Sequence, residues 1–90
     1  MAHLLFVVKD SFQIRGRGLV LAPGLPSDNA ELVVPGYPLE LRRPDGSVLN
    51  TTISGLEILD PNFYDVVPIL IADVAKEDVP VGTEVWSANA

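Results

Sequence analysis

The sequence predicts a single all-β domain over residues 1–90, built as a small closed antiparallel barrel of six or seven strands. Its apolar residues occur in short runs or alternate with polar ones, and no long stretch keeps the 3.6-residue period of a helix. Eight prolines and seven glycines interrupt these runs at close intervals. A barrel also removes the exposed strand edges that a small open sheet would present to other chains.

The first three strand signals lie within residues 4–21. Residues 4–8 and 19–21 are apolar and partly β-branched, which predicts strands that are buried on both faces. Residues 12–15 alternate apolar with polar side chains, which is typical of a half-buried strand. This alternation predicts that Phe12 and Ile14 point into the interior.

Three further strand signals follow within residues 39–72. Residues 39–42 alternate in the same way, so their two leucines should face the core. Residues 51–53 and 56–59 read as two halves of one strand that bends at Gly55. Residues 66–72 form a buried strand, and Pro68 should lie at its start or in an unpaired stretch, because proline cannot donate to a ladder.

Turn residues separate the predicted strands. Residues 23–29 are rich in proline, glycine and small polar residues, which indicates a loop. Residues 35–36 and 60–62 predict turns, and residues 44–47 predict a tight hairpin connection. Residues 75–79 predict a single helical turn.

The net charge of −6 is unevenly distributed. Residues 1–50 contain five basic and five acidic side chains, whereas residues 51–90 contain one basic and seven acidic ones. A field of this sign opposes non-specific binding to phosphate backbones. It either serves solubility or forms an acidic surface that meets a basic partner.

Composition excludes several kinds of site. The chain has no cysteine, so it forms neither a disulfide nor a thiolate metal site. Its only histidine, His3, has no second histidine with which to bind a metal, and no local motif places it in a serine triad. We therefore expect no catalytic activity and no cofactor. Without a leader or a run of roughly 18 apolar residues, a cytoplasmic protein that does not bind membranes is expected.

Four segments resemble one protein family in order and spacing. They are residues 10–20 (DSFQIRGRGLV), 34–41 (VPGYPLEL), 52–58 (TISGLEI) and 67–74 followed by 76–85 (VPILIADV and KEDVPVGTEV). Together they resemble the second domain of translational GTPases of the elongation factor Tu type, which implies a β-barrel over almost the whole chain. No glycine-rich segment ends in Gly-Lys-Ser or Gly-Lys-Thr, so the GTPase domain is missing and nucleotide hydrolysis is not expected.

The resemblance also implies positions for two contacts. Glu57 matches the glutamate that borders the family's pocket for the terminal adenosine of aminoacyl-tRNA. Asp60 stands where the family commonly has an arginine, so Glu57 is better interpreted as a solvated strand residue. Gly16, Arg17 and Gly18 match the loop through which such barrels approach the small ribosomal subunit. Alternatively, the glycines serve the turn alone.

A non-catalytic protein-binding module is the function that we predict from these features. The acidic second half would face a basic protein, and the aromatic pair Phe63 and Tyr64 would anchor the contact or cap an open end of the barrel. Such a module would act on or mimic part of the translation machinery, or serve as an antitoxin or immunity protein.

RNA or ribosome binding is the alternative. It would use the basic residues of the first half, which are Arg15, Arg17, Arg42 and Arg43. Their replacement by alanine should then abolish binding and flatten its dependence on salt.

Overall fold

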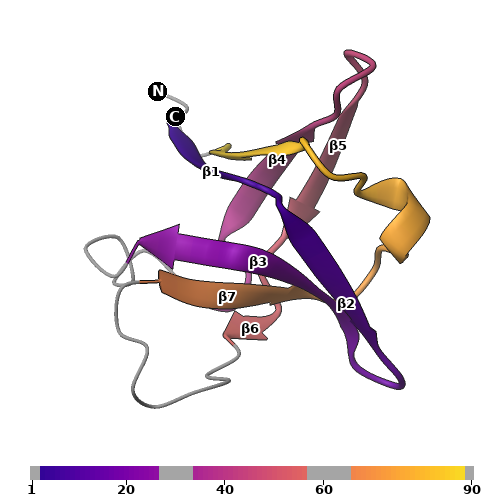
Figure 1. Cartoon of the computed structure of the whole chain (residues 1–90). Helices are drawn as coiled ribbons and strands as arrows, with labels where there is room; N and C mark the ends of the chain where they lie inside the picture. The colour runs from indigo at the N-terminus through magenta and orange to yellow at the C-terminus, as the bar shows by residue number, and fades with distance from the viewer. Residues whose placement is uncertain (1–2, 27–33, 57–65, 89–90) are drawn as a thin grey trace.

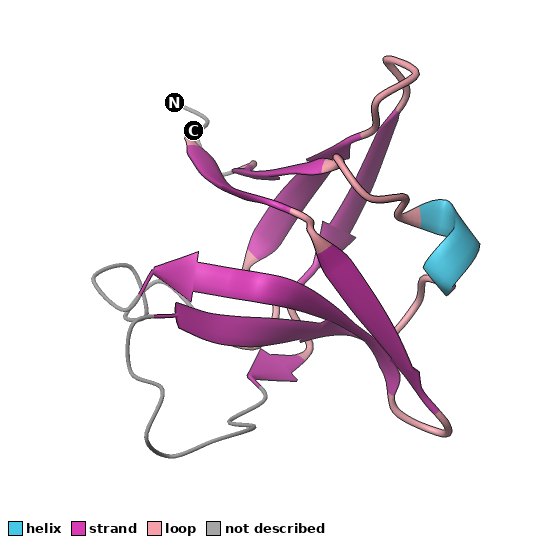
Figure 2. Cartoon of the chain, in the orientation of Figure 1, coloured by secondary structure: helices cyan, strands magenta, loops and turns pink. Residues whose placement is uncertain are grey.

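The computed structural model describes residues 3–26, 34–56 and 66–88 of the chain. These residues form eight strands and one short 3-10 helix, η2 (Lys76–Asp78). The strands are β1 (Leu4–Val7), β2 (Asp10–Ile14), β3 (Gly18–Pro26), β4 (Pro38–Arg42), β5 (Val48–Thr52), β6 (Gly55–Leu56), β7 (Val66–Ile71) and β8 (Glu84–Ser87). Figure 2 shows η2 as the single helical turn beside the strands. The all-β class and the helical turn within residues 75–79 are confirmed.

Two four-stranded antiparallel sheets make up the architecture (Figure 1). Sheet A has the strand order β1-β8-β4-β5, and sheet B has the order β2-β3-β7-β6. Each sheet therefore joins strands from the two ends of the sequence rather than from one half. The first described strand pairs with the last, with Leu4 opposite Trp86.

The chain crosses between the sheets at two corners. At the first corner, the Val8 amide donates to the Thr83 carbonyl (2.8 Å) before β8, and the Lys9 amide donates to Ala22 (2.9 Å) in β3. At the second corner, between β5 and β6, the Ile53 amide donates to Tyr37 (2.9 Å) just before β4, and the Ser54 amide donates to Leu70 (2.8 Å) in β7. The backbone groups at both bends are thus satisfied although the strands are interrupted there.

These corners differ from the closed barrel that the sequence predicts. Among the described residues the strands form two sheets, and no continuous ladder closes them into one barrel. The ladder is interrupted because each of two long extended segments bends and changes sheets. The predicted bend at Gly55 falls slightly earlier, at Ile53 and Ser54, and Gly55 begins β6.

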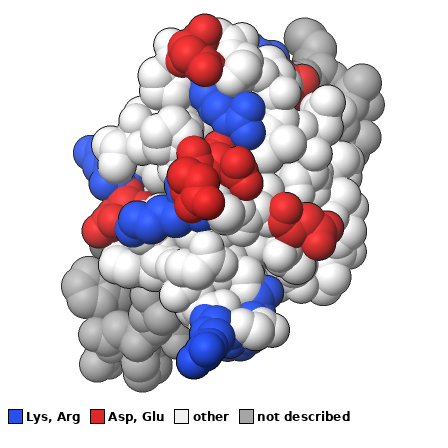
Figure 3. Space-filling view, turned by 90° about the vertical axis from the view of Figure 1, so that its right-hand side faces the viewer, with Lys and Arg blue, Asp and Glu red and all other residues white. Residues whose placement is uncertain are grey.

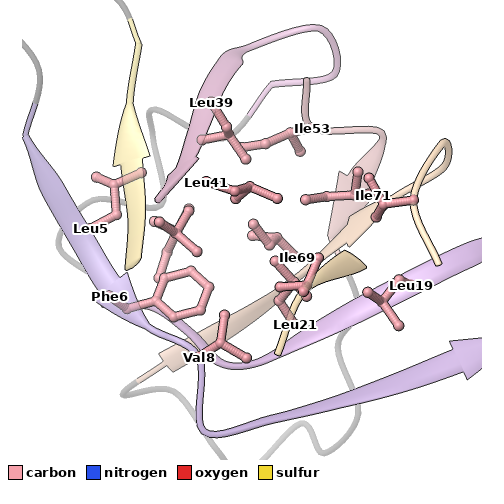
Figure 4. Close-up of a cluster of buried hydrophobic side chains, with 14 residues drawn as sticks. Leu5, Phe6, Val8, Leu19, Leu21, Leu39, Leu41, Ile53, Ile69 and Ile71 are labelled. Atoms are coloured by element: carbon pink, nitrogen blue, oxygen red, sulfur yellow. The ribbon is translucent and has the colours of Figure 1, made fainter. Parts of the chain in front are cut away.

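The core fills the space between the inner faces of the sheets (Figure 4). Leucines 39 and 41 on β4 have no exposed area, as their alternation predicts, and they belong to the same core cluster as Ile69 and Ile71 from β7. Burying an aliphatic side chain of this size contributes about 1.5–3 kcal/mol. Residues 19–21 are also fully buried, which confirms the prediction for that run.

Two predictions about strand orientation are wrong. Phe12 is 47% exposed, whereas its neighbour Ser11 is buried, and Ile14 is only half-buried. The reason is the bend after Val8, which resets the side-chain alternation before β2 begins. In residues 4–8, Leu4 and Val7 are 46% and 37% exposed, so this run is not buried on both faces.

Strand β3 extends into the segment that the sequence predicted as a loop. Residues 23–26 belong to the strand, and the rest of that loop lies outside the described residues. The pairing of β3 with β7 shifts between Leu21 and Leu25, which is a bulge. Gly24 lies in the bulge at φ +113°, where a Cβ atom would come within 2.2 Å of the Val67 carbonyl oxygen. Pro68 has no partner in the ladder, as predicted.

Candidate functional site

One face of sheet A is turned away from the core and carries both aromatic and charged side chains. We call it the outer face. Its members come from all four strands and are Leu4, Val7, Glu40, Arg42, Val48, Asn50, Glu84 and Trp86. The intervening residues Leu39, Leu41 and Val85 point the other way and are buried in the core. Strand alternation therefore defines the outer face.

The strand register arranges the outer face in two rows. In the first row, Leu4 lies opposite Trp86, which lies opposite Glu40, which lies opposite Asn50. The second row runs from Val7 through Glu84 and Arg42 to Val48. Side chains in such rows are close enough to contact one another.

A network of polar contacts links the centre of the outer face. The Arg42 guanidinium lies 4.0 Å from the centroid of the Trp86 ring. Its Nε donates to Glu40 Oε1 at 2.5 Å, and Trp86 Nε1 donates to Glu84 Oε1 at 2.9 Å. A guanidinium over an indole ring is attracted by the electrons of the ring face. These contacts connect the indole ring and the guanidinium to each other and to the two carboxylates.

Apolar side chains flank this polar centre on both sides. Leu4 and Val7 lie along one edge at 46% and 37% exposure, and Val48 lies along the other at 49%. The outer face of sheet B is different, because Val20 and Leu70 there are buried outside the main core cluster. Phe12 pairs with Val20 on that face and is 47% exposed, so among the described residues both sheets present large apolar side chains on their outer sides, and sheet A presents more of them.

The β2–β3 turn holds the first pair of predicted basic residues. Arg15 and Arg17 are exposed, with Gly16 between them at φ +77°. The Arg17 amide donates to the Ile14 carbonyl at 3.0 Å and so closes the turn. Gly18 is buried at φ +137°, and a Cβ atom there would come within 2.3 Å of the Ile71 carbonyl oxygen. Both glycines are therefore required by the hairpin itself.

The other pair of basic residues lies elsewhere. Arg42 is held on the outer face, whereas Arg43 Nε donates to the Asp78 carbonyl (2.7 Å) and Nη1 to Ser47 Oγ (3.2 Å). Figure 1 places the β4–β5 turn at the top of the molecule and the β2–β3 turn at the bottom. On the side shown in Figure 3, basic side chains form separate groups with acidic side chains among them. The structure does not gather the four arginines into one patch.

Three predicted site residues cannot be placed. Glu57, Phe63 and Tyr64 lie outside the described residues, as does Asp60. In the ranges 3–26, 34–56 and 66–88, no group of three or more His, Asp or Glu side chains is arranged to hold a metal ion. Within the same ranges, no helix is long and apolar enough to cross a membrane.

The sequence prediction missed Trp86, Glu84 and Leu4 as members of a candidate site. A signal for the first two was present, because Val85 between them is apolar and an alternating strand then points both of them outward. Their partners could not be found in this way, because the register of β8 with β4 joins residues that are distant in sequence.

Comparisons of the chain with models of protein families, with curated proteins and with solved structures found no match. The choice of the outer face as the candidate site therefore depends on the geometry of this chain.

Proposed function

We propose that this chain is a non-catalytic protein-binding module whose binding surface is the outer face of sheet A. The observation that supports the proposal is the stack of Arg42 on Trp86, 4.0 Å apart, at the centre of an uncovered sheet face. Tryptophan and arginine are the residues that most often dominate the energy of protein interfaces. Their side chains here already contact each other, so less side-chain entropy remains to be lost on binding.

The charge of the face favours a basic partner. Glu40 and Glu84 outnumber Arg42, and the whole chain has a net charge of −6. Glu40 is paired with Arg42, while Glu84 accepts only a neutral hydrogen bond from the indole among the contacts described. A lysine or arginine of a partner would find its counter-ion at Glu84, beside the apolar surface of Leu4 and Val7. The anchor role of Phe63 and Tyr64 stays a prediction.

We infer further that the two sheets belong to a barrel like the second domain of the elongation factor Tu family. The two corners support this inference, because hydrogen bonds there link the bending strands to both sheets. The strand pairings and the two bends together connect the eight described strands in one circuit that returns to β1. An action on the translation machinery, or an antitoxin or immunity role, would fit a barrel of this kind.

Affinity capture with matched variants tests the proposed surface. Leu4→Glu places a charge at the exposed edge of the outer face, and Arg15→Ala removes a charge at the distant hairpin tip. We expect the captured protein to be lost with Leu4→Glu and retained with Arg15→Ala. Equal recovery with the wild type and Leu4→Glu would contradict the proposal.

The same experiment addresses the RNA alternative. Recovery of RNA at low salt only, lost with Arg15→Ala, would move the binding site to the β2–β3 turn. Because Trp86 is the only tryptophan, its emission reports directly on occupancy of the outer face. Titration of a purified partner should change this emission.

A further inference from the structure

We propose that the free edge of β5 pairs with β5 of a second copy of this chain, antiparallel and with Asn50 on the two-fold axis. This contact uses an edge of sheet A and does not depend on the proposed binding function of the outer face. It would join the two A sheets into one continuous eight-stranded sheet.

The backbone of β5 has a row of groups that point away from β4, its neighbour among the described strands. The Arg43 amide donates to Ser47, and the Ile53 amide donates to Tyr37, so the hydrogen-bonded pairs of the β4–β5 ladder fall on odd-numbered residues. In an antiparallel ladder the alternate residues bond to the other side. The amides and carbonyls of Val48, Asn50 and Thr52 therefore face the open edge.

No other edge strand among the described residues is as open. Strand β1 has a register shift between Leu4 and Phe6, and β6 contains only two residues. Strand β2 contains Asp10, and the Lys76 ammonium donates to the Ser11 carbonyl. Charges and bulges of this kind are the devices by which natural proteins prevent edge pairing.

Strand β5 has none of these devices. Its five residues, VLNTT, contain no charge, proline or glycine, and they pair with β4 without a shift in register. Among the described strands, only β4 makes extensive contact with it. A regular, uncharged edge of this length is a template for another strand.

The edge is complementary to itself. Pairing about Asn50 places Val48 opposite Thr52 of the second copy, so every outward-facing backbone group meets another outward-facing group. Each such pair exchanges two N–H···O bonds. Val48 and Thr52 are both β-branched, a favourable cross-strand combination, and Asn50 would lie beside its own counterpart. Although the chain has a net charge of −6, no charged side chains of β5 would face each other.

Single cysteines test the register directly, because the chain has no cysteine of its own. In the proposed pair the two Asn50 Cα atoms lie about 5.5 Å apart, within the range of about 4.4–6.8 Å that a disulfide spans. The two Val48 Cα atoms would be separated by more than about 13 Å along the strands. We expect Asn50→Cys to form a disulfide-linked dimer under mild oxidation and Val48→Cys to form no disulfide cross-link.

The control is Val81→Cys, since Val81 is 68% exposed and lies in a turn away from the edge. Cross-linking of Asn50→Cys no faster than Val81→Cys would overturn the proposal. Equal cross-linking of Asn50→Cys and Val48→Cys would also overturn the proposal. It would indicate parallel strands, in which each residue lies beside its own counterpart.

Sedimentation velocity over a concentration series tests the association without a cross-link. We expect the wild type to dimerise and Asn50→Lys, which places two ammonium groups at the two-fold axis, to weaken the dimer about tenfold or more. Val81→Lys adds the same charge elsewhere and should dimerise as the wild type does. A wild-type chain that stays monomeric up to about 1 mM would refute the proposal.

Discussion

The β2–β3 and β4–β5 hairpins each contribute an inner strand and an edge strand to their sheets, but the two edge strands are protected differently. The edge of β2 is covered by Lys76, whose ammonium donates to the Ser11 carbonyl at 2.5 Å and whose amide donates to Gln13 Oε1 at 3.2 Å. The edge of β5 has no comparable contact among the described residues.

The two hairpins also differ in what their arginines do. Arg42 and Arg43 of the β4–β5 hairpin are bonded to Glu40, Ser47 and the Asp78 carbonyl. Arg15, at the tip of the β2–β3 hairpin, is exposed. One hairpin thus combines an open edge with ordered side chains, and the other combines a guarded edge with a basic tip. A candidate binding surface is therefore better identified from side chains that are both hydrogen-bonded and exposed than from charge alone.

The largest expected effect separates the turn glycines of the two hairpins. Gly18→Ala would place a methyl group 2.3 Å from the Ile71 carbonyl oxygen at φ +137°. We expect it to lower the free energy of unfolding by about 3 kcal/mol or more. Gly46→Ala, at φ +90° with no atom within 4 Å of the new Cβ, should cost only about 1 kcal/mol. Chemical denaturation measures both, and equal losses would contradict the contact with β7.

A smaller effect should follow from removing the Lys76 side chain, which covers the edge of β2. Lys76→Ala deletes the donor to Ser11 and the ammonium that lies 6.0 Å from the Phe12 ring centroid. Because the Lys76 side chain is 58% exposed, we expect a loss of only about 1 kcal/mol in the free energy of unfolding. The variant should also associate more strongly as its concentration rises.

The matched control for this variant is Lys9→Ala, which removes the same charge from an exposed position. It should change neither the midpoint of denaturation nor the sedimentation coefficient. If Lys9→Ala associates as Lys76→Ala does, the effect belongs to net charge and not to the edge of β2.

A still smaller effect should distinguish an ordered arginine from an exposed one. Arg42→Ala removes the cation from the Trp86 ring and should lower the free energy of unfolding by about 0.5–1 kcal/mol. Arg15→Ala should stay within about 0.5 kcal/mol of the wild type. Denaturation followed by tryptophan emission measures both, and only Arg42→Ala should shift the emission of the folded protein.

The smallest effect concerns the turn of the β4–β5 hairpin. Hydrogen bonds from the Ser47 hydroxyl and amide lower the pKa of Asp45 below its ordinary value. The folded pKa is thus depressed, so Asp45 stabilises the fold above its unfolded pKa, and this contribution is lost as the pH falls through the folded pKa. Ser47→Ala should raise the Asp45 pKa in an NMR titration, and an unchanged titration would disprove the role of the hydroxyl.

The sequence was a good guide where one strand face is apolar and the other polar. Leu39 and Leu41 alternate with charged residues, and both are buried as predicted. The same pattern failed at Phe12, because the bend after Val8 changes which face of β2 meets the core. Periodicity describes a strand on its own, whereas a corner depends on which other strands its backbone bonds to.

The candidate site was less accessible from the sequence. Predicting the outer face requires the pairing of β8 with both β1 and β4, and no local pattern contains that register. The basic residues of the sequence predicted a site at the four arginines instead, but hydrogen bonds hold Arg42 and Arg43 at separate places. Glu57, Phe63 and Tyr64 stay predictions.

The pairing of β1 with β8 has a consequence for the order of folding. Ser87 and His3 exchange hydrogen bonds at the end of this pair, and Leu4 meets Trp86. During synthesis β1 therefore lacks its pairing partner until β8, about 80 residues later, has emerged. Contacts between such distant residues slow folding, because the intervening chain loses conformational entropy before these contacts can form. Closure of sheet A should be a late event, and the single tryptophan on β8 would report its rate.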